Sequence, residues 1–342
     1  MKEKILLGMS GGLDSTYSVL QLKAAGYDVV GAVLKMSDNT DVEKAQIAAE
    51  TLGVPLHVVD CSKRFHDIVV KDFLEEYAAA RTPNPCVICN RYVKIDSLCE
   101  CARSLGISRV ATGHYANIGY DGNRYYIKKA MDLRKDQSYV LWRLTQDQLS
   151  MLTFPLAERE KKTVRAEAFE MNLPSADAEE SQEICFIPTN DYISYIEEAI
   201  GVFPEGDFLD EEGRVLGKHK GIIHYTIGQR KGLGLSLGKP GFVTAIDPVA
   251  NTVKVVSDES HIFSTHLVCD TLNFQKLAPM ENGRIRAEGK VRYAAKPVMA
   301  TVQIEGDSAK VQFDSPVRAV TPGQSIVFYD GDDVLMGGII RA

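Results

Sequence analysis

A short apolar run leads directly into a glycine-rich loop near the start of the chain. Residues 5–7 read Ile-Leu-Leu, residues 10–15 read Ser-Gly-Gly-Leu-Asp-Ser, and a helical pattern opens near Thr16. A strand that turns into a helix in this way directs several backbone N–H groups, and the positive end of a helix dipole, at one place. Gly11 and Gly12 permit positive φ and close approach of a ligand. The segment therefore predicts a phosphate site at the carboxyl end of a strand.

The loop differs from a Walker A motif, because no Gly-Lys-Ser or Gly-Lys-Thr follows it. Asp14 places a carboxylate beside the expected phosphates, which indicates bound Mg²⁺. The spelling Ser-Gly-Gly-x-Asp-Ser resembles the PP-loop of the ATP pyrophosphatases, in which ATP adenylates an acceptor and pyrophosphate leaves. The alternative interpretation is an ordinary glycine turn between a strand and a helix.

The first half of the chain alternates between strand and helix patterns, which predicts an α/β fold. Because the strands are separated by helices, we expect a Rossmann-like parallel sheet with helices on both faces. The expected strands are 29–34, 56–59 and 109–112, and the expected helices are 42–52, 65–80 and 92–105. A hairpin is expected over 116–118 and 125–128, and helices over most of 146–200.

The pattern changes after Gly201, where glycine is frequent and the apolar runs are short and alternating. This sequence pattern predicts two small, mainly β domains, the last of them a β-barrel. We expect a PP-loop domain with a helical extension over 1–203, a central β domain over 204–268 and the barrel over 269–342.

Composition places the chain among soluble globular proteins. It has 342 residues and no apolar run near the ~20 residues of a membrane span, and Met1–Lys4 lacks the apolar part of a signal peptide. Seven cysteines, an odd number, fit a reducing compartment better than a disulfide framework. We therefore expect a cytoplasmic protein without membrane contact.

A net charge of −7 argues against nucleic acid as a partner, but the charge is unevenly distributed. Six basic residues and no acidic one lie between Glu212 and Asp247, and a second basic stretch runs from Arg284 to Lys296. These stretches are compatible either with a phosphate backbone or with solvated strand faces.

Cys86 and Cys89 form a C-x-x-C pair that follows two prolines and lies just before an expected helix, whose N-terminus lowers a thiol pKa. A zinc site shared with Cys99 and Cys101 is disfavoured, because residues two apart on a helix point about 200° apart. A buried structural role is a second interpretation. The third is sulfur chemistry, or an iron–sulfur cluster, on Cys86, Cys89 and Cys185. The adenylating loop favours it, because ATP prepares an oxygen for displacement by sulfur.

Further motifs occur in a fixed order along the chain, and together they resemble the bacterial tRNA-specific 2-thiouridylases over nearly its whole length. The motifs are residues 8–15, 81–85, 89–90, 111–115, 135–139, 184–187, 219–221, 226–234 and 321–325. The resemblance implies a sulfurtransferase that replaces O2 of the wobble uridine with sulfur in tRNAs for Lys, Glu and Gln. ATP adenylates O2, a persulfide on Cys185 supplies sulfur, and Cys89 attacks the persulfide, so that AMP and a disulfide remain.

The resemblance also implies binding roles. ATP with Mg²⁺ would contact Gly8, Met9, Ser10, Gly11, Gly12, Leu13, Asp14 and Ser15, with Leu34 and Gly113 at the adenosine. The target base would face Asn84, Pro85 and Cys86. The rest of the tRNA would contact His114, Lys135, Asp136, Gln137, Arg292, Tyr293 and Gln324. The implied partners are the tRNA anticodon stem-loop and a cysteine desulfurase or sulfur-relay protein, and the implied state is a monomer.

Two features depart from the family pattern. Many members carry Asp where this chain has Cys86, so an acid–base role at this position is open, and a [4Fe–4S] cluster on Cys86, Cys89 and Cys185 is an alternative route for sulfur. The segment 35–41 is also short for the family. The competing functions are an amide-forming PP-loop synthetase, which needs no paired thiols, and an RNA-binding module with a vestigial nucleotide site.

Overall fold

The computed structural model describes residues 2–176, 184–187 and 189–341, and its N-terminal part contains the predicted parallel sheet. Five strands lie in the order β3-β2-β1-β4-β7, and every neighbouring pair is parallel. Their bounds are β1 Lys4–Gly8, β2 Asp28–Lys35, β3 Leu56–Asp60, β4 Val110–Thr112 and β7 Leu152–Thr153. The expected α/β class is confirmed.

Helices cover both faces of the sheet, which explains why β1 is apolar at consecutive positions. Leu6 packs in the same core as Leu98 of α6, whereas Ile5 and Leu7 pack with residues of α1 and α2. The bounds of these helices are α1 Leu13–Ala24, α2 Val42–Thr51 and α6 Ile95–Ser104. Three further helices of this part are α7 Gln146–Met151, α8 Lys161–Glu170 and α9 Tyr192–Ile200, with a 3-10 turn η3 at Ser138–Leu141.

Two expected helices differ from the prediction, because each contains a π-helical segment. The expected helix 65–80 is α3 Ser62–Phe65, the π-helix η1 His66–Val70 and α4 Lys71–Ala78. The expected helix 92–105 begins earlier, as α5 Pro85–Cys89 and the π-helix η2 Asn90–Lys94, before α6. Cys86 and Cys89 therefore lie inside a helix rather than before one. Proline is favourable in the first helical turn, where its missing N–H costs nothing.

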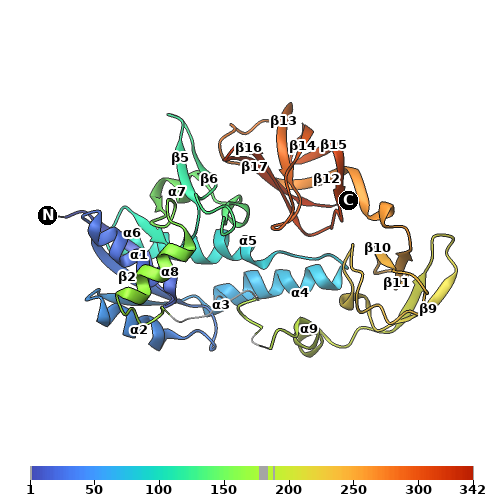
Figure 1. The fold of residues 1–342 in the computed structure, drawn as a ribbon, viewed down its shortest axis with the longest axis horizontal. Helices are drawn as coiled ribbons and strands as arrows, with labels where there is room; N and C mark the ends of the chain where they lie inside the picture. The colour runs from blue at the N-terminus through green and yellow to red at the C-terminus, as the bar shows by residue number, and fades with distance from the viewer. Residues whose placement is uncertain (1, 177–183, 188, 342) are drawn as a thin grey trace.

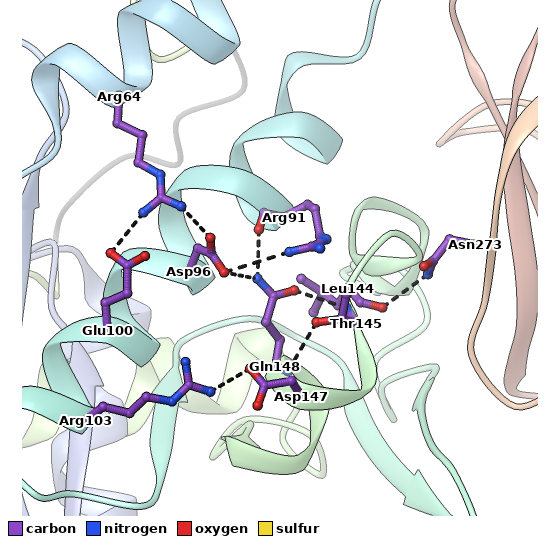
Figure 2. A network of polar contacts seen from close by, with 10 residues as sticks. All are labelled: Arg64, Arg91, Asp96, Glu100, Arg103, Leu144, Thr145, Asp147, Gln148 and Asn273. Carbon is purple, nitrogen blue, oxygen red and sulfur yellow. Dashed lines mark hydrogen bonds and ion pairs between the residues drawn. The ribbon is translucent and has the colours of Figure 1, made fainter.

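A polar network centred on Gln148 holds η2 against α6 and α7 (Figure 2). The Gln148 amide donates to the Arg91 carbonyl and to Asp96 Oδ1, both at 2.8 Å, and its Oε1 accepts the Thr145 N–H. Arg64 of α3 pairs with Asp96 and Glu100 of α6. A π-turn disturbs the regular i→i−4 ladder, and Gln148 supplies a partner for one carbonyl within it.

The expected hairpin is present, and it belongs to the same sheet as the strands of the C-terminal barrel. It consists of β5 Asn117–Tyr120 and β6 Tyr125–Lys128, and β6 pairs with the C-terminal strand β17 at Lys128 and Asp333. The hairpin thus connects the N-terminal part to the C-terminal barrel.

The two predicted β units are confirmed. The central sheet has the order β10-β11-β8-β9, with bounds β8 Gly206–Leu209, β9 Val215–His219, β10 Phe242–Asp247 and β11 Thr252–Val256. The last six strands form a barrel that is closed by pairing of β12 with β17. They are β12 Phe263–Phe274, β13 Asn282–Lys290, β14 Val298–Glu305, β15 Ser308–Arg318, β16 Ser325–Asp330 and β17 Asp333–Ile340. The exact domain limits remain a prediction.

Figure 1 shows the parallel sheet at one end of the molecule and the central β sheet at the other, with α4 extending between them beneath the barrel. Across the described residues, no helix combines the length and the apolar character needed to span a membrane.

A buried amide fastens the barrel to the N-terminal part of the chain. Gln275 is fully buried, and its Nε2 donates to the carbonyls of Leu141 and Trp142, both at 2.9 Å. Its Oε1 accepts the Ile127 N–H at 3.0 Å. The buried Trp142 indole donates to Ser325 Oγ and packs against Gly337, where an added Cβ would come within 2.5 Å of the ring. The contact therefore satisfies backbone groups on two elements at once.

We expect Gln275→Leu to destabilise this contact by about 2–4 kcal/mol, because it leaves one buried N–H and two buried carbonyls with fewer partners. Trp142 is the only tryptophan in the chain, so its fluorescence reports on this interface directly. The urea midpoint followed at Trp142 should fall in Gln275→Leu, whereas Gln303→Leu, on the exposed face of β14, should leave it nearly unchanged. Equal midpoints in the two variants would contradict this role.

Candidate nucleotide and thiol site

A cavity of about 470 Å³ lies at the carboxyl ends of the parallel strands, within the size range of small-molecule sites. The strand order reverses between β1 and β4, and ligands bind at such switch points. Gly8 ends β1 and Gly113 follows β4, and an added Cβ on Gly113 would come within 3.0 Å of the Asp14 backbone. The absence of a side chain at Gly113 therefore lets the two loops meet at one edge of the cavity.

The glycine-rich loop has the geometry that the sequence predicts for an anion site. Gly11 has φ +75°, and an added Cβ would lie 2.6 Å from the Lys44 carbonyl carbon, so only glycine fits beside α2. Gly12 is the N-cap of α1 and has no side chain to cap the helix. The hydroxyls of Ser15 and Thr16 both donate to the Gly12 carbonyl. The N–H groups of the first turn are thus left without a side-chain cap and suit a phosphate.

Most of the residues predicted to bind ATP line this cavity. Those that line it are Gly8, Met9, Ser10, Asp14, Ser15, Leu34 and Gly113. Gly11, Gly12 and Leu13 are not among the lining residues, and Leu13 instead packs in a core with Tyr17. The cavity, its glycines and its uncapped helix fit an adenine nucleotide.

Asp14 is already paired with a buried lysine that sequence reasoning missed. Lys161 Nζ lies 2.6 Å from both carboxylate oxygens of Asp14, and the Tyr115 hydroxyl donates to Asp14 Oδ1 at 3.1 Å. The Lys161 backbone N–H donates to Asp132, which fixes the start of α8. The carboxylate predicted to bind Mg²⁺ is thus compensated by the Lys161 ammonium in this structure. Nothing in the sequence indicates that Lys161, and not the neighbouring Lys162, pairs with Asp14.

The structure places Cys185, and a methionine that contacts Cys89, in the lining of the cavity. Cys185 lines the cavity together with Met36, and Cys89 Sγ lies 3.9 Å from Met36 Sδ. Cys89 is buried, whereas Cys86 and Cys185 are exposed, and all seven cysteines are free. Phe186 anchors the Cys185 segment, because its ring makes edge contacts with Phe65, Phe73 and Tyr195 at 5.3–5.6 Å.

Burial raises the pKa of the Cys89 thiol to about 11, and it also raises the pKa of Cys185. Negative charge on Cys185 or Cys86 raises the pKa of Cys89 further, which means that the three thiols are electrostatically coupled. Lys94 acts in the opposite direction on both Cys89 and Cys185. Among the described residues, no group of three or more His, Cys, Asp or Glu side chains is arranged to hold a metal ion. The [4Fe–4S] alternative on Cys86, Cys89 and Cys185 stays a prediction.

His114 also lines the cavity and is held neutral. Burial, with a smaller contribution from Lys94, lowers the pKa of His114 to about 3. Its Nδ1 lies 2.8 Å from Thr112 Oγ1, at the end of β4. A neutral imidazole beside the cavity offers a hydrogen bond to a base and no charge to a phosphate.

Other residues predicted to contact tRNA make intramolecular contacts in this conformation. The Asp136 carboxylate is buried and accepts from Ala130 N–H and from Ser138. Gln137 lines the cavity, and its Oε1 accepts the Tyr115 N–H. Lys135 belongs to the same turn, since its N–H donates to the Asp132 carbonyl.

Two of the predicted tRNA residues of the barrel, Tyr293 and Gln324, contact the N-terminal part, and the third, Arg292, contacts the segment between β9 and β10. Arg292 donates to the Ile227 carbonyl and to Thr321, while its buried Nε has no partner among the described residues. The Tyr293 hydroxyl donates to the Asp136 carbonyl at 2.9 Å. The Gln324 amide donates to the carbonyls of Thr82 and Pro83, directly before Asn84 and Pro85.

Several cations of the two basic stretches have carboxylate partners. Arg214 pairs with Asp210 and Glu212, Lys218 pairs with Asp207, and Arg286 pairs with Asp314. These pairs reduce the positive charge that the sequence alone assigned to the strand faces.

Models of three protein domains match the chain in succession. A tRNA methyl transferase HUP domain matches residues 3–189, a tRNA methyl transferase PRC-barrel domain matches 193–257, and an aminomethyltransferase beta-barrel domain matches 264–340.

Curated relatives match the chain from end to end, and three of them share the name tRNA-specific 2-thiouridylase MnmA. The protein of Acetivibrio thermocellus is 45% identical over 359 residues, with 99% of each chain covered. That of Clostridioides difficile is 42% identical over 358 residues and covers 100% of this chain and 99% of the relative. That of Clostridium acetobutylicum is 44% identical over 361 residues, with both chains fully covered. The chain therefore belongs to the tRNA-specific 2-thiouridylase family of enzymes, as its ordered motifs predicted.

Proposed function

We propose that the protein uses ATP to replace O2 of the wobble uridine of tRNA with sulfur carried on Cys185. The observation that carries this proposal is the common position of Cys185 and the glycine-rich loop in one cavity. A nucleotide bound at that loop would direct its phosphates along the cavity that also reaches Cys185. The tRNAs for Lys, Glu and Gln are the proposed substrates, as they are in the sequence-based prediction.

The first step is adenylation. The uridine leaves its stack so that it reaches the cavity, and its O2 attacks the α-phosphorus of ATP while pyrophosphate leaves. The N–H groups of the first turn of α1 would stabilise the phosphates, because they lack a side-chain cap. Neutral His114 lines the same cavity and is available to hydrogen bond the base or the ribose.

The second step is sulfur transfer. The outer sulfur of a Cys185 persulfide attacks C2, and Cys89 then attacks Cys185 Sγ, so the S–S electron pair moves to the departing sulfur. The C2–S double bond forms as AMP leaves, and a Cys89–Cys185 disulfide remains for reduction by an external thiol. A cysteine desulfurase or relay protein would supply the persulfide to the exposed Cys185. Cys89 is buried with a raised pKa, so it must be uncovered or deprotonated before it attacks.

An amide-forming synthetase is the competing PP-loop function, and it offers no role for the coupled thiols. The deciding experiment is mass spectrometry of anticodon nucleosides from a thiolation-deficient host that expresses this chain. Appearance of 2-thiouridine supports the proposal, and its absence with a well-expressed, folded protein contradicts it.

We expect Cys185→Ser and Cys89→Ser to lower 2-thiouridine formation by more than about 10³-fold, because each removes a group that forms a covalent bond. Both variants should still release pyrophosphate in the presence of tRNA. Cys86→Ser is the matched variant and should keep activity within a few-fold, because the two-thiol route does not use it. A loss in Cys86→Ser as large as that in Cys89→Ser would instead favour the three-thiol cluster.

Because Asp14 pairs with Lys161, we expect the effects of substituting these two residues on the rate of pyrophosphate release to be strongly non-additive. Asp14→Asn and Lys161→Met should each slow pyrophosphate release, and the double variant should be little worse, which corresponds to a coupling energy of about 1–3 kcal/mol. The Mg²⁺ concentration that gives half-maximal release should not change in Asp14→Asn. A clear rise in that concentration, with additive effects of the two substitutions, would show that Asp14 serves the metal.

Because His114 is neutral in the folded protein, we expect part of the free energy of unfolding to be lost in acid. Its pKa is about 3 in the folded protein and about 6.5 when unfolded, so the folded state excludes a proton that the unfolded state binds. The contribution of neutral His114 to the free energy of unfolding is complete above about pH 6.5, and it decreases as the pH falls toward 3. Denaturant midpoints at a series of pH values should therefore fall more steeply for the wild type than for His114→Gln. Parallel curves would show that His114 is not held neutral.

A further inference from the structure

Lys94 is the only lysine or arginine among the residues that line the cavity in the described part of the chain. The other charged lining residues are Asp14, which is paired with Lys161, and Asp41, which caps α2 by accepting the Lys44 N–H. No carboxylate among the described residues forms an ion pair with the half-buried Lys94. The cavity thus contains one cation whose charge no described protein group balances.

The π-helix η2 explains how Lys94 reaches the cavity from a helix that also carries Cys89. The two positions are five apart, and in an α-helix such positions point about 140° apart. A π-turn bonds residue i to residue i+5, which brings the two positions onto one side. Gln148, which is buried, donates to the Arg91 carbonyl within η2 and to Asp96 just after it, so both ends of the Lys94 turn are fixed (Figure 2).

Lys94 lines the same cavity as Cys185, His114 and Ser10 of the nucleotide loop. Its positive charge lowers the pKa of Cys89, Cys185 and His114. The PP-loop itself carries no lysine, unlike a Walker A loop. An anion that bridges the loop and the thiols would therefore meet the Lys94 ammonium.

On these grounds we propose that Lys94 binds the α-phosphate of the adenylate, and this inference rests on the proposed function. The α-phosphate is the group that must lie between the loop and Cys185 during both steps, and it becomes the dianionic end of AMP when the C2–O bond breaks. A fixed ammonium beside it stabilises the charge that develops there without any rearrangement. Lys94 is then a catalytic residue that contacts the reacting phosphate.

The test compares the affinities of AMP and adenosine, which differ only in the phosphate, by calorimetry on the full-length protein. Lys94→Met and Lys94→Gln should weaken AMP binding by about 10- to 100-fold and leave adenosine binding within about twofold. The affinity of Lys94→Arg for AMP should lie between those of these variants and that of the wild type. Lys63→Met is the control, because Lys63 is an exposed lysine on α3 that pairs with Asp67 outside the cavity.

The possible results separate the two proposals. Wild-type affinity for AMP in both Lys94→Met and Lys94→Gln would overturn the role of Lys94 and leave the proposed function standing. An equal loss of AMP and adenosine binding would also overturn it, because the lysine would then act only through the shape of the cavity. A wild-type protein that binds neither AMP nor ATP would overturn the proposed function, and the inference with it.

Discussion

The parallel pairing of β1 with both β2 and β4 is the constraint on which the site depends. Gly8 is in register with Ala32 on one side and with Thr112 on the other, so the chain leaves β1 and β4 at the same edge of the sheet. Because the strand order reverses there, the two loops diverge and leave space between them. Glycine at position 113 keeps the loops in contact at their base. Cys185, which lies far along the chain, lines the cavity that this space forms.

Sequence reasoning was sufficient for the features that depend on local pattern. The apolar run of β1 and the glycine turn after it follow directly from residue type and spacing, as do the alternating strands of the barrel, whereas α1 begins at Leu13 and not near Thr16 as predicted. The C-x-x-C pair and Cys185 were also grouped at one site, because the adenylating loop favoured sulfur chemistry and the family resemblance then implied roles for Cys89 and Cys185. Nothing in the spacing of residues nearly a hundred positions apart specifies that they share a cavity.

The parts that sequence did not predict are those set by long-range contacts. The two π-helices have no sequence pattern of their own, and η2 depends on Gln148, 57 positions after Arg91, for a carbonyl partner. Lys161 and Gln275 look like ordinary polar residues until the fold buries them against Asp14 and against three backbone groups. For the same reason nothing in the sequence of the hairpin β5–β6 indicates its partner strand β17, which lies at the far end of the chain.

The distribution of charge around the cavity follows one physical logic. Burial disfavours charged groups unless a partner compensates them. Asp14 has Lys161, Asp136 has backbone and hydroxyl donors, and His114 is neutral. Cys89 and Cys185 favour the protonated thiol, because burial raises the pKa of both. Lys94 differs from these groups, because no carboxylate among the described residues pairs with it in its half-buried position. This uncompensated charge is the observation behind the proposal that the cavity binds an anionic phosphate.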